Sequence, residues 1–360
     1  MYKFLIYISH PYSIPIGKPL QIEIEKRGYQ VCWFSELEYT KNYFQNNEKI
    51  LTVQEVLEYE PHIVLTATDS VADFFTGIKV QVFHGFSANK RPLLNSHFKI
   101  RGFFDLYTTQ GPSTTEIFQQ LAKKYGFFEV VETGWSKVDP LFPINTKPNT
   151  EKPVILISST FTERLSLAKI DDVYNEIQRL LLTGKYRFLC VLHPKLNQNT
   201  KEKFKNLESV NFQYFDTTDL VPLYVKADIM FSDTTSAIIE FLLQEKPVVT
   251  FRNNKPGEHL IDISKVEDIE KALDLALSKP EKTMMAIQDY IKWTHPYYDG
   301  KSSFRTIDAC ISFLEKDKSN LKSKPWNLIR KWKMRKLLNH FTLKSYNKPI
   351  TLNLEKPGKK

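Results

Sequence analysis

Short runs of β-branched and aromatic residues alternate along the chain with longer stretches whose apolar positions recur at helical spacing. Each short run predicts a buried strand, and each longer stretch predicts an amphipathic helix. The strands are expected at 4–9, 30–34, 62–66, 80–83, 106–109 and 130–133 in the first half, and at 154–158, 188–192, 212–215, 229–231 and 248–251 in the second. The clearest helical patterns cover 114–125, 170–182, 237–243 and 266–277.

An alternation of strands and helices is typical of parallel sheets built from βαβ units. It occurs twice here, and the two series are separated by residues 139–153, which contain four prolines and few helix signals. The sequence therefore predicts an α/β protein with two Rossmann-like, doubly wound domains that face each other across a cleft. We expect the first domain at 1–145, the second at 146–318 and a tail at 319–360.

Composition narrows the class of protein. The 360 residues are 42% hydrophobic and 25% charged, which is typical of a soluble globular protein and excludes a wholly disordered chain. No apolar run approaches the roughly 18–20 residues of a membrane span, and the first apolar run is too short for a signal peptide. The three cysteines, Cys32, Cys190 and Cys310, are far apart, which predicts a reducing cytoplasm and no metal site.

The positive charge is concentrated at the carboxyl end. The formal net charge is +9, yet residues 321–360 contain ten Lys, two Arg and one Glu, so the other 320 residues carry 38 basic and 40 acidic side chains. Apolar residues that include Trp326 and Trp332 recur among these cations, which favours docking of 321–343 on an anionic membrane surface. The alternative is a helix that packs on the body. A nucleic-acid partner is not expected, because the body offers no basic patch.

Two of the predicted strands end in a histidine. His84-Gly85 follows the strand at 80–83, and His193-Pro194 follows the strand at 188–192. In open α/β sheets ligands bind beyond the carboxyl ends of the strands, so both positions favour a site. His84 is suited to accept a proton near pH 7, Gly85 to let backbone N–H groups approach an anion, and His193 to stabilise charge on a phosphate. The alternative is a pair of structural histidines that bond locally.

Two further segments combine hydroxyl and charged side chains at expected helix starts. The strand at 229–231 is followed by Ser232, Asp233, Thr234, Thr235 and Ser236. Capping a helix needs one hydroxyl, so this run favours a phosphate site over simple capping. Near the end of the second series, Asp299-Gly300 predicts a turn before a helix, and Lys301, Ser302 and Arg305 would place positive charge and hydroxyls close to a diphosphate. The alternative is a turn followed by a capped helix.

Other chemistries fit the sequence less well. It contains no phosphate-binding loop of the Gly-x-x-x-x-Gly-Lys-Ser/Thr type, no dinucleotide fingerprint, no nucleophile elbow and no His-Glu-x-x-His pair. The remaining histidines lack metal-ligand spacing and are expected on the surface or in packing; they are His10, His62, His97, His259, His295 and His340.

Taken in order between about residues 80 and 311, these segments resemble the CDP-glycerol glycerophosphotransferase family, the teichoic-acid-type polymerases and primases. The matching segments are His84-Gly85 with a basic residue soon after at Lys90, Gly134 to Asp139, Ser159-Thr160-Phe161, His193-Pro194, Ser232 to Ser236 and Asp299 to Arg305. Three features depart from the family pattern: a proline is missing between Gly134 and Asp139, Thr234-Thr235 replaces Tyr-Ser, and the arginine after Phe161 is displaced, with Arg164 as its candidate.

The resemblance implies a GT-B fold with the acceptor on the first domain and CDP-glycerol held mainly by the second. It implies transfer of glycerol phosphate to a hydroxyl of a membrane-linked saccharide or polymer with release of CMP, His84 acting as the base. Gly85, Lys90, Thr160 and the two later segments would bind substrate. No cofactor is expected beyond a divalent cation bridging the diphosphate, and the enzyme would lie at the inner face of the cytoplasmic membrane.

Two other functions stay open from the residues. One is a glycosyltransferase or UDP-sugar 2-epimerase of the same fold that acts on a nucleotide sugar. The other is a surface protein that binds a nucleotide without catalysis.

Overall fold

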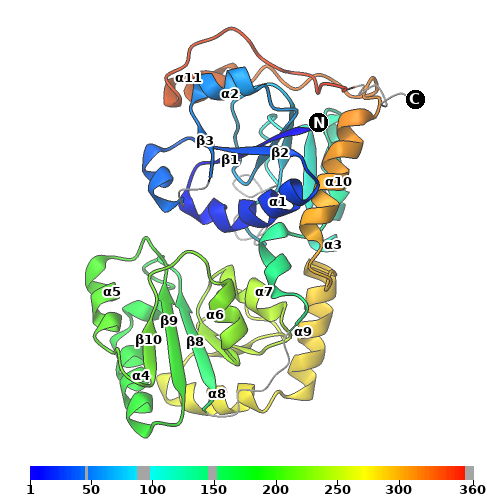
Figure 1. Cartoon of the computed structure of the whole chain (residues 1–360). Coiled ribbons are helices and arrows are strands. Elements are labelled where there is room, and N and C mark those ends of the chain that lie inside the picture. Colours follow the sequence, from blue (N-terminus) through cyan, green and yellow to red (C-terminus); the bar gives the residue numbers. More distant parts are fainter. Residues whose placement is uncertain (45–47, 87–97, 145–151, 353–360) are drawn as a thin grey trace. The chain divides into compact units, whose positions relative to one another are not determined.

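The computed structural model describes residues 1–44, 48–86, 98–144 and 152–352. The chain forms two compact units. Unit 1 contains Met1–Pro140 together with Thr294–Lys360, and unit 2 contains Leu141–Trp293. Each unit has one parallel sheet covered by helices, as Figure 1 shows.

The sheet of unit 1 has the strand order β3-β2-β1-β4-β5-β6-β7. Its strands are β1 (Lys3–Ile8), β2 (Gln30–Ser35), β3 (Ile50–Leu51), β4 (Ile63–Thr66), β5 (Ile78–Gln81), β6 (Leu106–Thr109) and β7 (Glu129–Glu132). All neighbouring pairs are parallel, so every carboxyl end lies at one edge. The strand order reverses between β1 and β4, and at such a switch point parallel sheets leave a crevice for ligands.

Helices from both ends of the chain cover this sheet. They are α1 (Ile14–Lys26), α2 (Val53–Tyr59), α3 (Pro112–Tyr125), α10 (Ser302–Glu315) and α11 (Leu328–Leu337). One core cluster is rich in aromatic side chains, including Tyr7, Phe34, Phe75, Tyr107 and Phe118, and it also contains Met334 of α11. The last helices are therefore integral to unit 1.

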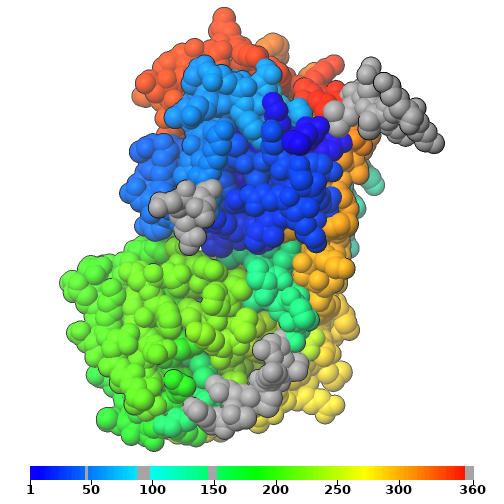
Figure 2. All heavy atoms as spheres, in the orientation of Figure 1, coloured from blue at the N-terminus to red at the C-terminus, as the bar shows by residue number. Residues whose placement is uncertain are grey.

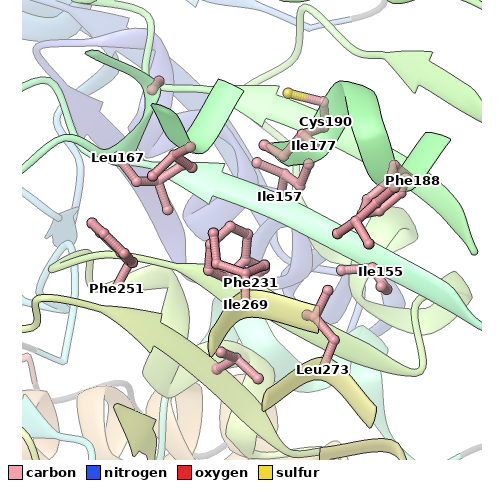
Figure 3. Packing of buried hydrophobic residues seen from close by; sticks show 14 of the residues in the cluster. Ile155, Ile157, Leu167, Ile177, Phe188, Cys190, Phe231, Phe251, Ile269 and Leu273 are labelled. Carbon is pink, nitrogen blue, oxygen red and sulfur yellow. The ribbon is translucent and has the colours of Figure 1, made fainter. Parts of the chain in front are cut away.

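The sheet of unit 2 has the order β10-β9-β8-β11-β12-β13, which reverses between β8 and β11. Its strands are β8 (Val154–Ser159), β9 (Arg187–Leu192), β10 (Phe212–Tyr214), β11 (Ile229–Ser232), β12 (Val248–Phe251) and β13 (Ile261–Ile263). Its helices are α4 (Asp171–Thr183), α5 (Gln198–Lys205), α6 (Val221–Lys226), α7 (Ala237–Leu242), α8 (Ile269–Leu277) and α9 (Glu281–Thr294). Figure 3 shows how aliphatic and aromatic side chains from β8, β9, β11 and α8 interlock in its core.

The predicted α/β class with two Rossmann-like sheets is confirmed. All eleven expected strands form, with ends shifted by at most two residues, and the four expected helices form with shifts of at most three. The pattern missed β3 and β13. β3 has only two residues, and β13 reads Ile-Asp-Ile, so neither contains the longer apolar run that predicts a strand.

The predicted domain limits differ from the compact units. Residues 294–318 were expected in the second domain and 319–360 as a separate tail, yet both belong to unit 1. The reason is packing: α10 buries Ile307, Cys310 and Phe313, and Arg27, directly after α1, pairs with Asp308 on α10. The first boundary, expected at 145, lies at Pro140.

The segment after α10 is attached to unit 1 by buried ion pairs. Lys324 Nζ lies 2.7 Å from Asp105, and both side chains are almost fully buried. Arg335 on α11 donates two hydrogen bonds to Asp73, of 2.7 and 3.2 Å, and Lys331 lies 3.7 Å from the same carboxylate. Burial raises the pKa of Asp73, but the hydrogen bonds and charges of its partners outweigh burial and hold that pKa below its ordinary value. Among the described residues, no helix combines the length and apolar character that a membrane span requires.

We predict that Asp73→Ala lowers the free energy of unfolding by about 3–5 kcal/mol, because two buried cations lose their partner. Chemical denaturation with circular dichroism measures this loss. The control is Asp308→Ala, whose carboxylate is 50% exposed in its pair with Arg27 and should contribute about 0–1 kcal/mol. Equal effects of the two substitutions would contradict a special role for Asp73.

Candidate active site

His84 lies at the carboxyl edge of the sheet in unit 1, three residues after β5. Phe83 before it has a left-handed backbone with φ 57°, which turns the chain away from the strand direction. The imidazole Nδ1 lies 2.9 Å from the carbonyl oxygen of Ala67, just after β4. The ring is therefore held toward the β1/β4 switch point, as the sequence predicted for a strand-end histidine.

This contact fixes the protonation pattern of the neutral ring. A carbonyl oxygen only accepts hydrogen bonds, so the Nδ1 of His84 must carry the hydrogen. The lone pair of the neutral imidazole is then on Nε2. A histidine with this tautomer can accept a proton through Nε2, which is the geometry that a general base requires.

Aromatic side chains follow β1 and surround His84. The Tyr12 ring centroid is 5.8 Å from that of His84 and 5.4 Å from that of His10, and the Nδ1 of His10 lies 2.8 Å from the hydroxyl of Tyr39. Burial and then the charge of Asp69 raise the pKa of Tyr12 to about 12, so its phenol stays protonated. The sequence prediction assigned His10 to surface or packing. His10 follows the first strand, just as His84 follows β5. That position is the signal that could have identified His10 as a neighbour of the candidate site.

Gly85 and Lys90 were predicted to bind substrate together with His84. Gly85 is buried, its carbonyl oxygen accepts a hydrogen bond of 3.0 Å from Gln110, and a Cβ built on it would meet no atom of the described residues within 4 Å. Lys90 lies outside the described residues.

In unit 2, Asp233 connects the two strands that flank the switch point. Its carboxylate, at the end of β11, accepts hydrogen bonds from Ser159 Oγ at 2.6 Å, Thr160 N at 3.0 Å and Leu167 N at 3.0 Å. The side chain is fully buried, and burial raises its pKa above the ordinary value despite these bonds. Asp233 and Thr160 were both predicted to bind substrate, and here the carboxylate of Asp233 and the backbone N–H of Thr160 bond to each other within the fold.

The next three residues are partly exposed at the same edge. Thr234 Oγ1 accepts a hydrogen bond from Asn254 N, and Thr235 Oγ1 accepts a long one of 3.4 Å from Ala237 N. Ser236 precedes α7, but its side chain makes no capping bond. Because α7 has only six residues, few peptide dipoles align there, and the hydroxyls are the main polar groups of this segment.

His193 follows β9 and has the opposite hydrogen-bond pattern to His84. Its Nδ1 accepts a hydrogen bond of 3.1 Å from the backbone N–H of Lys195, so the neutral ring carries its hydrogen on Nε2. Its ring packs against Phe161, which follows β8, with centroids 4.5 Å apart. His193 thus lies next to the β8/β11 switch point with Nε2 as a donor. Arg164 lies exposed in the loop that follows Phe161.

The last of the family segments, Asp299 to Arg305, is called the closing motif below. It has a structural role that the sequence did not reveal. Residues 299–305 lie in unit 1, not in the predicted second domain. The carboxylate of Asp139 accepts the backbone N–H groups of Ser302 and Ser303 at 2.8 and 2.7 Å, so a carboxylate already occupies the start of α10. Ser302 is buried, whereas Lys301 is exposed.

Arg305 also connects the start of α10 to the rest of unit 1, and we call this set of contacts the α10 joint. It forms two hydrogen bonds with the carboxylate of Asp299, donates to the carbonyl oxygen of Thr133 at 2.8 Å, and lies over the ring of Tyr297. Ser302 and Arg305, predicted to hold a diphosphate, therefore join the end of β7 to α10.

Gly134 completes this joint. Its φ of 80° is left-handed, and a Cβ there would lie 2.4 Å from Ser302 Oγ and 3.0 Å from His295 Nε2. The His295 Nε2 accepts a hydrogen bond from Trp135 N. Burial, followed by the charge of Arg305, lowers the pKa of His295 to about 4, so this histidine is neutral at pH 7. Within the described ranges, no group of three or more His, Cys, Asp or Glu side chains could hold a metal ion.

Residues 75–307, more than half of the chain, match the family described as CDP-glycerol:poly(glycerophosphate) glycerophosphotransferase. The chain belongs to this family. It is accordingly a CDP-glycerol glycerophosphotransferase-like enzyme, which confirms the resemblance of the ordered motifs. No curated protein sequence matches the chain.

Solved structures confirm the GT-B fold. The wall teichoic acid polymerase TagF superposes with a TM-score of 0.63 at 14% identity, covering 86% of this chain and 88% of that chain. A UDP-N-acetylglucosamine 2-epimerase structure from Listeria monocytogenes gives 0.61 at 16% identity, covering 87% and 96%. The S. aureus MnaA structure with UDP gives 0.61 at 14% identity, covering 90% and 99%.

We predict that Gly134→Ala destabilises unit 1 more than Gly28→Ala. Both glycines have positive φ, so each substitution costs about 1–2 kcal/mol for the left-handed backbone. Only at Gly134 does the new methyl group meet Ser302, which should add about 1–3 kcal/mol. Urea unfolding of both variants measures the difference; a smaller loss for Gly134→Ala than for Gly28→Ala would refute the close packing.

Proposed function

We propose that this enzyme transfers glycerol phosphate from CDP-glycerol to a hydroxyl of a membrane-linked cell-surface saccharide or polymer and releases CMP. The observation that carries the proposal is the pair of opposite tautomers. The strand-end histidine of unit 1 presents an accepting Nε2, and that of unit 2 presents a donating Nε2. A phosphoryl transfer from a nucleotide donor needs one base for the acceptor and one donor for the leaving group.

In the proposed step, the acceptor oxygen attacks the glycerol-side phosphorus of CDP-glycerol. The new P–O bond forms as the bond to the bridging oxygen breaks, and that oxygen leaves as part of CMP. The acceptor proton passes to Nε2 of His84, whose Nδ1–H is held by Ala67. We propose that Tyr12, whose ring lies beside that of His84 and whose phenol is protonated at neutral pH, donates a hydrogen bond to the acceptor.

On the donor side, His193 would donate a hydrogen bond from Nε2 to a phosphate oxygen as negative charge develops on CMP. The hydroxyls of Thr234, Thr235 and Ser236, at the switch point of unit 2, are proposed to bind the diphosphate. A divalent cation that bridges the phosphates would be carried by the substrate. Lys301 is exposed in the joint of unit 1 and is the one residue of the closing motif that we keep as a proposed substrate contact.

The proposed acceptor places the enzyme at the inner face of the cytoplasmic membrane. The UDP-sugar 2-epimerase reaction is the second candidate, because epimerase structures share this fold. The family match supports CDP-glycerol as the donor, and nucleotide preference is the measurement that distinguishes the two reactions.

We predict that His84→Asn lowers turnover of CDP-glycerol by about 10²–10⁴-fold, the usual contribution of a positioned base. Asn retains a donor for the Ala67 carbonyl but has no basic nitrogen. The control is His62→Asn, which changes a histidine at the amino end of β4, the opposite edge of the same sheet. Release of CMP in the presence of acceptor measures turnover, and full activity of His84→Asn would exclude it as the base.

We predict that CMP and CDP-glycerol stabilise the protein more than UMP and UDP-N-acetylglucosamine do. A ligand at 100 times its Kd should add about 2.7 kcal/mol to the stability of the folded state. Thr235→Val should weaken stabilisation by CDP-glycerol, because it removes a hydroxyl proposed to bind the diphosphate. Thr200→Val, on helix α5, is the control. Thermal unfolding with each nucleotide measures the effect, and a preference for uridine nucleotides would favour the epimerase.

A further inference from the structure

Helix α11 faces unit 1 with the opposite polarity to an ordinary surface helix. Such helices normally turn their apolar residues to the core and their charged residues to water. In α11 the inward positions are Lys331, Met334 and Arg335, which are buried, and both cations form ion pairs with Asp73. Lys331 also donates to Ser345, and Arg335 donates to the carbonyl oxygens of Thr342 and Lys344.

The outward positions of α11 and its flanks carry the large apolar side chains. Trp326 is 75% exposed, Ile329 74% and Trp332 54%. Leu328, Leu337, Phe341 and Leu343 are exposed as well. Figure 2 shows the orange and red carboxyl-terminal segment on the outer surface of unit 1. We call these seven residues the α11 patch. Seven large apolar side chains exposed to water within 18 successive residues are typical of a surface that binds a partner.

The charges around the α11 patch indicate the partner. Arg330, Lys333 and Lys336 are exposed between the apolar side chains, and the sequence contains no Asp or Glu between residues 318 and 354. A second copy of the same patch would be repelled by these cations. Nucleic acid would use the cations and the two Trp rings, but not the aliphatic Leu328, Ile329 and Leu337. An anionic lipid surface can bind the aliphatic side chains, the Trp rings and the cations together. Aliphatic side chains enter the acyl boundary, Trp lies at the headgroup level, and Lys and Arg pair with phosphates.

We propose that the α11 patch is a preformed docking surface for anionic phospholipid. Many interfacial helices fold only on contact with the membrane and lose conformational entropy when they bind. Here the Asp73 ion pairs and the buried Met334 already hold the helix so that the residues of the α11 patch face outward. Binding therefore requires no ordering of α11. The inference concerns lipid alone and does not depend on the proposed reaction.

The experiment uses the full chain without nucleotide and compares sedimentation with vesicles of phosphatidylglycerol and of phosphatidylcholine. We expect binding to phosphatidylglycerol vesicles that weakens with added salt, and little binding to phosphatidylcholine. Ile329→Asp with Trp332→Asp should weaken it at least tenfold. The matched control is Leu182→Asp with Val210→Asp, which changes two apolar residues of unit 2 that are 89% and 84% exposed and should leave binding unchanged.

A second pair of variants separates charge from apolar contact. Lys333→Glu with Lys336→Glu reverses two exposed charges that lie between the apolar residues of the α11 patch and should weaken binding roughly tenfold or more. Lys123→Glu with Lys124→Glu, exposed on α3, is the control. Equal binding to both lipids, unchanged binding of the patch variants, or loss of a dimer or of bound RNA instead of lipid in those variants would each overturn the proposal. CMP release with a soluble acceptor in the same variants tests the reaction separately.

Discussion

Buried aspartates that accept backbone N–H groups from distant segments hold both sheets together at their strand ends. Asp233 accepts the N–H of Thr160 in unit 2, and Asp139 accepts those of Ser302 and Ser303 in unit 1. At the opposite ends of the strands, Asp105 accepts Lys79 N and Asp228 accepts Val154 N. A backbone donor that is buried without an acceptor is costly, so each carboxylate stabilises the contact between the two segments that it links.

The residues of the family segments fall into two groups, those buried within the fold and those at the edges of the sheets. Asp233 and Ser302 sit inside the fold, where their polar groups are used by neighbouring backbone and side chains. The imidazoles of His84 and His193 lie at the edges of their sheets, partly exposed, each held through Nδ1 by a backbone group. A motif that looks uniform in sequence therefore combines residues buried inside the fold with residues partly exposed at the edge of a sheet.

Most of the fold was predictable, because strands such as β1 and β11 contain short apolar runs whose burial dictates their conformation. The positions of His84 and His193 were predictable too, since parallel strands deliver their following residues to one edge. The return of residues 294–318 to unit 1 was not, because sequence order gives no information about which of two similar sheets a helix covers. Nor was the polarity of α11: only the position of Asp73, far away in the chain, makes Lys331 and Arg335 buried residues.

The interrupted path of unit 1 has a consequence for biosynthesis. Its sheet is complete by β7, but Asp139 gains its two N–H donors only after the whole of unit 2 has been translated. At the ribosome, the earlier polypeptide must therefore wait with part of its apolar surface uncovered while unit 2 folds as a continuous piece. Nascent chains that stall before residue 300 are for that reason the species in which this protein is most vulnerable to proteases and chaperone capture.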